Sequence, residues 1–329
     1  MLVLKRSDVE KALSMGEAIE ALEQAFAAFS AGRAKVPLRT VIHVEGTAEG
    51  DAIFMPGHVQ GSGVAVKMVS VFPGNIYAGK PTINSAVAVI DESTGEPLAV
   101  MDGAYLTALR TGAASGAATK HLARRDSRIA AVIGAGVQGR TQLEAVCCVR
   151  DIKEARIYDQ DKERAAKYIE DMKMKLKGVR FVAAKKSDEA VMDADVVITA
   201  TTSTKPVFSA ESLKKGAHIN AIGAYTPRMQ EIPEELLKMA GKIVVDSREA
   251  VLAEAGDFLI PMGKGVFSPD NIYAELGEIT SGSMPGREHD DEITLFKTVG
   301  IAVEDVACAA MVYKKALVMG LGERIDLNG

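Results

Sequence analysis

The spacing of apolar residues changes near residue 128 and divides the chain into two regions. In the first region, short apolar runs typical of strands follow one another without helical patterns between them. These runs lie at 40–45, 52–55, 64–72, 84–91 and 98–101. Because strands in direct succession usually pair in opposite directions, we expect a mainly antiparallel sheet here.

Helical patterns flank these strands. Ser7 and Glu10 have the spacing of a capping box, which predicts the start of a short helix. Two longer helices are expected where apolar residues recur every three or four positions or small residues dominate: 15–31 and 106–124. A third amphipathic helix is expected at 302–318, outside this region. The first region is therefore predicted to be of the α+β class.

From residue 129 onward, strand and helix patterns alternate. Strands are expected near 129–133, 155–159, 179–183, 195–199, 217–222 and 242–246. Helices are expected near 138–149, 161–176, 209–213 and 233–239. This alternation predicts a parallel, doubly wound α/β sheet with right-handed crossovers. Beyond it, 256–268 is interrupted by glycine and proline, 271–280 resembles a short helix, and 282–287 is predicted to be a loop.

A glycine-rich turn joins the first strand of this alternation to its first helix. Gly134, Gly136 and Gly139 have the GxGxxG spacing, and Asp159 follows at the end of the next predicted strand. The first glycine permits a tight turn, the second lets a pyrophosphate approach, and the third allows close helix–strand packing. The free N–H groups of the helix N-terminus attract the anion. The pattern predicts a Rossmann-type dinucleotide site, although such a turn can also serve only as a connection.

Asp159 bears on which dinucleotide is bound. Its carboxylate can accept hydrogen bonds from both ribose hydroxyls and would repel a 2′-phosphate, and no arginine follows it immediately. NAD is therefore favoured over NADP as the cofactor, while Lys162 keeps NADP open.

Length and composition limit the classes of function. A chain of 329 residues can form two domains, and its net charge of −5 and low aromatic content argue against a nucleic-acid partner. No apolar run is long enough for a membrane span or a signal peptide. Three cysteines cannot form a disulfide framework, which favours the cytoplasm, and the five histidines show no metal-ligand spacing.

Three cations of the first region are candidates for chemistry. Lys67 lies within an apolar run, where burial would lower its pKa and suit it to proton transfer, unless it is an edge lysine that reaches water. Arg110 lies among small residues and could bind a carboxylate or phosphate through two hydrogen bonds, unless it is a surface arginine of a helix. Arg39 precedes a strand and is a weaker candidate.

Several motifs together resemble the ornithine cyclodeaminase/mu-crystallin family over nearly the whole chain. They are Lys67 with 72–75, 79–82, 91–102, 109–115, 134–139, 218–223, 286–293 and 299–305. The resemblance implies a homodimer whose substrate-binding and dimerisation domain comprises 1–113 and 303–329, with an NAD-binding Rossmann domain over 114–302. It also implies that the first domain and the C-terminal helix build the dimer interface.

The resemblance also assigns roles to individual positions. Arg39, Lys67 and Arg110 would surround the substrate carboxylate, with Lys67 as the catalytic proton donor or acceptor and Val299 near the substrate. The positions that would line the cofactor are Thr82, Arg110, Thr111, Gly134, Gly136, Val137, Gln138, Gly139, Asp159, Thr201, Ile222, Gly223, Ala224, Tyr225 and Thr298.

One departure from the family pattern narrows the expected reaction. Ornithine cyclodeaminases carry an aspartate after the Ile-Gly pair, and this sequence has Tyr225 there. A phenol with an ordinary pKa of about 10 is a poor base near neutral pH, so cyclodeamination is disfavoured.

We therefore expect an NAD-dependent oxidoreductase acting at the α-carbon of a small L-amino acid, either an alanine dehydrogenase or a reductase of a cyclic ketimine. The partner would be a small amino acid, a 2-oxo acid or a cyclic imino acid. A non-catalytic binding protein of the mu-crystallin kind is the remaining alternative.

Overall fold

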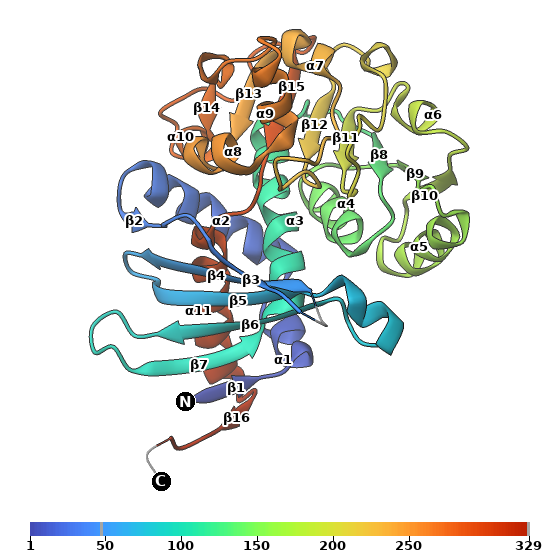
Figure 1. Cartoon of the computed structure of the whole chain (residues 1–329). Coiled ribbons are helices and arrows are strands. Elements are labelled where there is room, and N and C mark those ends of the chain that lie inside the picture. Colours follow the sequence, from blue (N-terminus) through green and yellow to red (C-terminus); the bar gives the residue numbers. More distant parts are fainter. Residues whose placement is uncertain (47–48, 328–329) are drawn as a thin grey trace. The chain divides into compact units, whose positions relative to one another are not determined.

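The structure is a computed structural model that describes residues 1–46 and 49–327. It divides into two compact units, one formed by Met1–Arg110 with Ile301–Gly329 and the other by Thr111–Gly300 (Figure 1). The boundaries implied by the family resemblance, after 113 and after 302, lie within a few residues of this division. The first unit is therefore built from both ends of the chain.

An eight-stranded sheet forms the centre of the first unit in the part of the chain that is described. Its order is β16-β1-β7-β6-β5-β4-β2, with β3 paired to β4, and all of these pairs except β1–β7 are antiparallel. The strands are β1 (Leu2–Leu4), β2 (Ala34–Lys35), β3 (Thr40–Val44), β4 (Gly50–Val59), β5 (Gly63–Val71), β6 (Ile83–Ile90), β7 (Pro97–Asp102) and β16 (Glu323–Arg324). The prediction of a mainly antiparallel sheet is confirmed.

The helices of the first unit include the last helix of the chain. They are α1 (Arg6–Ala12), α2 (Met15–Ser30), the 3-10 helix η1 (Pro73–Ala78), α11 (Ala302–Met319) and the first part of α3 (Gly103–Leu122), which ends in the second unit. Helix α11 packs against β4, β5 and α2. It approaches β4 so closely that a Cβ on Gly57 would lie 3.1 Å from the Cβ of Ala302. The N-terminal turn of α11 is thereby fixed on the sheet.

The two faces of this sheet differ in burial. On β5, Ala65 and Lys67 are buried, whereas the alternate residues Val66 and Met68 are half-buried or exposed, as the side-chain alternation of a strand requires. A similar alternation is present on β4, β6 and β7, whereas β3 is exposed on both sides. We call the less buried side the open face and define it by apolar residues that the register places on this side: Ile42, Val44, Phe54, Val66 and Met68.

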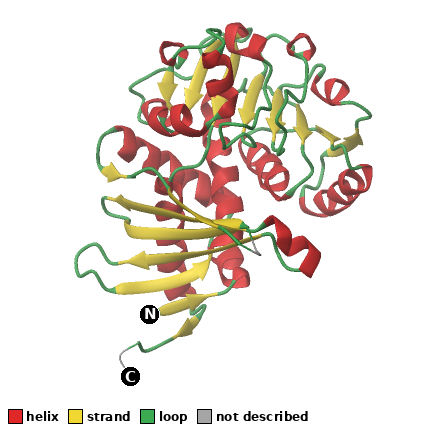
Figure 2. Cartoon of the chain, viewed as in Figure 1, coloured by secondary structure: helices red, strands yellow, loops and turns green. Residues whose placement is uncertain are grey.

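The second unit contains an eight-stranded parallel sheet among the described residues, in the order β10-β9-β8-β11-β12-β15-β13-β14. The strands are β8 (Ile129–Ile133), β9 (Glu154–Tyr158), β10 (Arg180–Ala183), β11 (Val196–Thr199), β12 (His218–Ala221), β13 (Ala240–Val245), β14 (Ala274–Glu275) and β15 (Ile293–Lys297). Its helices lie on both sides of the row of strands (Figure 2). They are α4 (Val137–Val149), α5 (Lys162–Lys175), α6 (Ser187–Val191), η2 (Ala210–Ser212), α7 (Glu234–Met239), α8 (Arg248–Glu254), α9 (Gly256–Gly263), η3 (Pro269–Asn271) and α10 (Leu276–Thr280). The predicted Rossmann-type sheet is confirmed.

Several local predictions were wrong. Helix α1 begins one residue before Ser7, and the capping carboxylate is that of Asp8, which accepts a hydrogen bond of 2.9 Å from the Lys5 N–H. The segment 256–268 contains helix α9 despite Pro261 in its interior, and the helix expected over 271–280 covers only its second half as α10. Strand β15 was missed altogether, although it lies between β12 and β13.

Candidate functional site

The first unit contains a buried cluster of two cations and two carboxylates, which we call the Lys67 cluster. The Lys67 Nζ lies 2.9 Å from Oδ2 of Asp305, and the Arg110 Nε lies 3.2 Å from Oδ1 of the same carboxylate. Arg110 also donates through Nη1 to Oε2 of Glu304 at 2.7 Å. The four side chains are at most 6% exposed. Asp305 thus holds the two predicted substrate-binding cations together.

Three separate elements supply these side chains. Lys67 points from β5 towards the face covered by α11, and Arg110 comes from α3. Glu304 and Asp305 lie in the first turn of α11, where the positive end of the helix dipole favours carboxylates. The Glu304 Oε1 also accepts a hydrogen bond of 2.9 Å from the Ile301 N–H, which holds its carboxylate in position.

The environment of Lys67 suits it to proton transfer. Burial and the neighbouring Arg110 lower the pKa of Lys67 to about 8, although Asp305 opposes the shift. For Arg110, burial opposes the charge, but Asp305 and Glu304 together raise its pKa above the ordinary value. One cation of the pair is therefore permanently charged, and the other titrates within the range in which general acids and bases act.

The other predicted residues of the first unit come from separate segments. Arg39 is half-buried in the loop between β2 and β3. Thr82 precedes β6, and its carbonyl accepts a hydrogen bond of 2.8 Å from the Phe72 N–H. Glu304 and Asp305 were not among the predicted site residues. Their signal in the sequence is a pair of adjacent acids inside an otherwise apolar helical stretch.

In the second unit, the glycine loop has the form that a pyrophosphate site needs. Gly134 has a φ of +106°, and a Cβ there would lie 2.4 Å from the Ala200 carbonyl oxygen. A Cβ on Gly139 would lie 2.2 Å from the Gly134 carbonyl oxygen, so this glycine permits the close helix–strand packing. By contrast, a Cβ on Gly136 would meet no atom within 4 Å, and this N-cap of α4 makes no side-chain capping bond. Gly136 therefore has open space beside it and lies next to the free backbone N–H groups at the start of α4. This combination suits the binding of a dinucleotide phosphate.

Two further predicted residues begin α4. Val137 is 67% exposed, and the side-chain oxygen Oε1 of Gln138 is buried without a hydrogen-bond partner among the described residues. A buried acceptor with no partner is costly in a folded chain, so this atom fits a position that a ligand completes. On α3, the Thr111 carbonyl accepts a hydrogen bond of 2.9 Å from the Gln142 side chain of α4.

Asp159 supports the glycine loop directly. Its Oδ2 accepts a hydrogen bond of 2.8 Å from the Ala135 N–H, and its Oδ1 accepts one of 2.9 Å from the Asp161 N–H. The Arg164 Nη1 lies 3.8 Å from Oδ1. Because each carboxylate oxygen can accept more than one hydrogen bond, Asp159 can also receive a ribose hydroxyl.

Buried carboxylates hold the other turns predicted to line the cofactor. Glu231 accepts hydrogen bonds from the Thr201 N–H and the Gly223 N–H, each at 2.6 Å. Asp246 accepts one from the Thr298 hydroxyl at 2.6 Å and one from the Val299 N–H at 2.9 Å. Glu231 and Asp246 were not predicted, because neither lies in a recognisable sequence motif.

The remaining predicted residues belong to the turn after β12. The Ile222 N–H donates to the Thr199 carbonyl at 3.0 Å, Ala224 is buried, and Tyr225 is half-buried. The family resemblance is the ground for comparing Tyr225 with the aspartate of ornithine cyclodeaminases.

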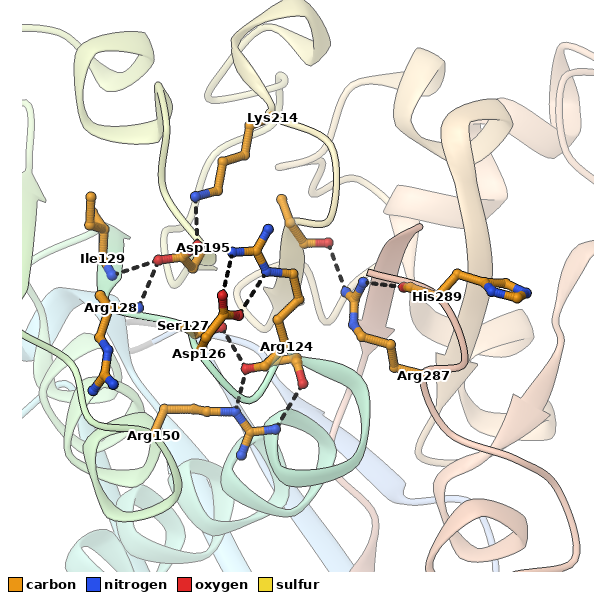
Figure 3. A network of polar contacts seen from close by, with 12 residues as sticks. Arg124, Asp126, Ser127, Arg128, Ile129, Arg150, Asp195, Lys214, Arg287 and His289 are labelled. Carbon is orange, nitrogen blue, oxygen red and sulfur yellow. Dashed lines mark hydrogen bonds and ion pairs between the residues drawn. The ribbon is translucent and has the colours of Figure 1, made fainter. Parts of the chain in front are cut away.

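A cavity of about 550 Å³ at the end of α3 is rich in arginine, and two of its guanidinium groups, those of Arg150 and Arg287, donate to backbone carbonyls at this helix end. Figure 3 shows Arg150 donating to the Arg124 carbonyl and Arg287 donating to the His289 carbonyl. Arg150 also donates to the Ala123 carbonyl at 2.8 Å and to the Thr119 carbonyl at 2.9 Å, and Arg287 also donates to the Leu122 carbonyl at 2.6 Å. These bonds cap the C-terminus of α3. The cavity is lined by Lys120, His121, Ala123, Arg124, Arg125, Asp126, Arg150, Gly286, Arg287, Glu288 and Asp290.

The described residues give no sign of a metal centre, since none of their His, Cys, Asp and Glu side chains form a group that could hold an ion. Burial and the nearby Arg287 lower the pKa of His218 to about 3, so its neutral ring serves as a hydrogen-bond partner of Thr294 and Asn220. None of the helices described is long and apolar enough to cross a membrane.

Comparisons with known proteins show the family of this chain. The sequence model of the ornithine cyclodeaminase/mu-crystallin family matches residues 1–319. A Δ(1)-pyrroline-2-carboxylate reductase of Bacillus cereus is 43% identical over 99% of this chain and 100% of its own. The Thermococcus litoralis Δ(1)-pyrroline-2-carboxylate reductase in complex with NADH and L-proline is 47% identical, covers 99% and 100% of the two chains, and has a TM-score of 0.94. An archaeal alanine dehydrogenase dimer with bound NAD is 40% identical over 99% of each chain, with a TM-score of 0.91.

Proposed function

The chain belongs to the ornithine cyclodeaminase/mu-crystallin family, and from this we propose that it is an NAD-dependent oxidoreductase that reduces a cyclic imino acid to the corresponding L-amino acid. Δ(1)-Pyrroline-2-carboxylate, which would give L-proline, is the substrate that its similar relatives favour. The observation that carries the proposal is the buried Lys67 ammonium, which shares Asp305 with Arg110 and has a pKa of about 8.

The second unit is proposed to bind the dinucleotide. Gly134, Gly136 and Gly139 would receive the pyrophosphate at the N-terminus of α4, and Asp159 would accept the ribose hydroxyls. When bound, NADH supplies the hydride. The other residues proposed to line it are Thr82, Arg110, Thr111, Val137, Gln138, Thr201, Ile222, Gly223, Ala224, Tyr225 and Thr298.

The first unit is proposed to bind and protonate the imino acid. Arg39 and Arg110 would hold its carboxylate, because guanidinium groups pair with carboxylates through parallel hydrogen bonds, and Val299 would contact its apolar part. The Lys67 ammonium would give a proton to the imine nitrogen as the imine carbon gains a hydride, so that the C=N bond becomes a CH–NH bond. Asp305 would hold Lys67 in position and favour reprotonation of its amine by solvent.

Oxidative deamination of alanine is a second candidate, supported by the likeness to the archaeal alanine dehydrogenase. In that direction the neutral Lys67 would accept a proton, and water would hydrolyse the imine to a 2-oxo acid and ammonia. Ring-forming release of ammonia from ornithine is disfavoured, because the chain has a phenol, Tyr225, where the family resemblance calls for an aspartate.

A substrate panel distinguishes these activities. NADH consumption should be fastest with Δ(1)-pyrroline-2-carboxylate or its six-membered homologue and slower with pyruvate plus ammonium. Faster turnover of pyruvate would assign the chain to the alanine dehydrogenases instead. Ammonia released from ornithine without net NADH consumption would identify a cyclodeaminase, and NADH binding without turnover of any compound would indicate a binding protein.

Replacing Lys67 tests the proposed proton donor. Lys67→Ala should lower kcat by about 10²- to 10⁴-fold, which is the usual contribution of a positioned acid, while NADH still binds. Lys315→Ala is the matched control, because it removes a lysine of the same unit whose ion pair with Glu17 is partly exposed. Undiminished turnover of Lys67→Ala would refute the assignment.

We further propose that the chain forms a homodimer through the open face of the first unit. Ile42 and Met68 are 52% and 37% exposed on this face, and an apolar sheet face of this kind needs a partner. The archaeal alanine dehydrogenase of similar fold is a dimer. The three cysteines are free, which favours a cytoplasmic location.

A further inference from the structure

Glu231 is a buried carboxylate that joins two turns of the second unit. It lies after β12, is 0% exposed, and accepts three hydrogen bonds. Its Oε1 accepts from the Thr201 N–H at 2.6 Å, and its Oε2 accepts from the Gly223 N–H at 2.6 Å and the Thr199 hydroxyl at 2.9 Å. One side chain therefore connects the carboxyl ends of the neighbouring strands β11 and β12.

Close packing extends this connection to the glycine loop. A Cβ on Gly223 would lie 2.1 Å from the Thr201 carbonyl oxygen and 2.5 Å from Oε1 of Glu231. A Cβ on Gly134 would lie 2.4 Å from the Ala200 carbonyl oxygen, immediately before Thr201. The three turns touch one another with no room for an additional methyl group, so a shift of the Thr201 turn would displace the others.

Asp257, which is paired with Lys297, holds the backbone of Glu231 in place. Asp257 accepts hydrogen bonds through Oδ1 from the Glu231 N–H at 2.7 Å and the Ile232 N–H at 3.1 Å. Its Oδ2 lies 2.9 Å from the Lys297 Nζ, and both side chains are 0% exposed. The backbone of Glu231 is thus held by α9 and β15. Its carboxylate can therefore fix the positions of the Thr201 and Gly223 turns, from whose N–H groups it accepts hydrogen bonds.

We propose that Glu231 is a positioning residue for the dinucleotide, because it sets the spacing of the turns after β8, β11 and β12. It does not contact reacting atoms in this role. The inference rests on the proposed function, since those turns carry Gly134, Thr201 and Gly223. Without the carboxylate, two buried N–H groups lose their acceptor, and the turns would separate to find other partners.

The test is the isosteric change Glu231→Gln. An amide offers only one acceptor oxygen, and its NH₂ group would face one of the two backbone N–H groups. That contact between two donors is unfavourable and would displace the turn that carries the N–H. We expect the Kd for NADH, measured by fluorescence titration, and the KM for NADH to rise by about 10- to 100-fold, as for the loss of a charged hydrogen bond. The KM for the imino acid should change by less than about twofold.

Asp195 provides a matched control within the same sheet (Figure 3). Its Oδ2 accepts hydrogen bonds from the Arg128 N–H at 2.7 Å and the Ile129 N–H at 2.9 Å, at the amino end of β8. Asp195→Asn therefore removes a similar carboxylate at the opposite edge, and it should lower stability without changing the Kd for NADH by more than about twofold.

The outcomes separate the two proposals. If the unaltered protein binds no NADH, the proposed function fails. If it binds NADH and Glu231→Gln binds equally well, or if Asp195→Asn is weakened to the same extent, the positioning role is wrong while the proposed function stands. Should Glu231→Gln fail to fold, Thr199→Val removes only the hydroxyl bond to Oε2. It should raise the Kd for NADH about threefold or more, and an unchanged Kd would equally overturn the inference.

Discussion

The titration of Lys67 should determine how the reaction depends on pH. Its pKa of about 8 lies within the assay range, and the proton donor for imine reduction is the charged form. We expect kcat/KM for reduction to be level below pH 8 and to fall about tenfold per pH unit above it, whereas kcat/KM for amino-acid oxidation should rise about tenfold per pH unit below pH 8 and be level above it. Initial rates in both directions between pH 6 and about 10.5 check this. Profiles that do not bend near pH 8 would contradict it.

The same shift affects stability with a definite sign. Between about pH 8 and the ordinary lysine value of 10.5, the unfolded chain binds more protons at this position than the folded chain. The contribution of Lys67 to the free energy of unfolding therefore increases with pH over this window and is lost as the pH falls through 8.

Asp305→Asn is the companion variant for this profile. Asp305 raises the pKa of Lys67 against burial and Arg110, so its removal should move the bend of the reduction profile to lower pH. A bend that stays in place would show that Lys67 is not the titrating group.

The sequence could identify the cations of the site but not their partners. Lys67 was a candidate because an ammonium inside an apolar run must be paired or shifted in pKa. Its carboxylate partner lies 238 residues away, and that of Arg110 lies 194 residues away. No local pattern encodes such a pairing, because it depends on how α11 packs against the sheet.

At the scale of elements, the arginine caps of α3 predict a stability effect without a functional one. Arg150→Met removes the donors to the Thr119 and Ala123 carbonyls and leaves those acceptors partly buried, so unfolding should become easier by about 2–4 kcal/mol. Chemical denaturation measures this change. Arg128→Met is the control, because the Arg128 side chain is 49% exposed and pairs with an exposed Asp151, so its loss should cost less than about 1 kcal/mol. An equal effect of both variants would show that the caps do not stabilise α3.

The alternation of strands and helices could be predicted wherever the apolar pattern was regular. Helix α9 was missed because Gly256, Pro261 and Gly263 are residues that usually end helices, and its tertiary packing overrides them. Strand β15 was missed because it is short and ends on Lys297, yet that lysine is fully buried. Lys297 is accommodated by its ion pair with Asp257, a contact that only the folded chain reveals.

At the scale of the molecule, the open face predicts how copies associate. Ile42→Asp places a charge on this face and should convert a dimer to monomers, because burying an unpaired carboxylate between two apolar surfaces is strongly unfavourable. Light scattering during size-exclusion chromatography measures the mass. Met174→Asp is the control, since Met174 is 78% exposed on α5 of the second unit. A dimer that survives Ile42→Asp would place the interface elsewhere.

The two-unit organisation could be anticipated because the two regions differ in the period of their apolar pattern. The glycine motif and the parallel sheet follow from local sequence, so the turn proposed to bind the cofactor could be located from the sequence. The return of α11 to the first unit was expected only from the family resemblance. Nothing in the periodicity of 302–318 specifies which sheet it covers.

The contribution of both chain ends to the first unit has a consequence for synthesis on the ribosome. Thr111–Gly300 is continuous and can fold as soon as it has emerged. The antiparallel sheet, however, lacks α11 until the whole second unit has been made, and until then Lys67 and Arg110 lack the carboxylates that pair with them. The first unit is therefore completed after the second, although most of its strands are made before it. A nascent chain that stalls before Asp305 would contain a folded second unit and an incomplete first unit.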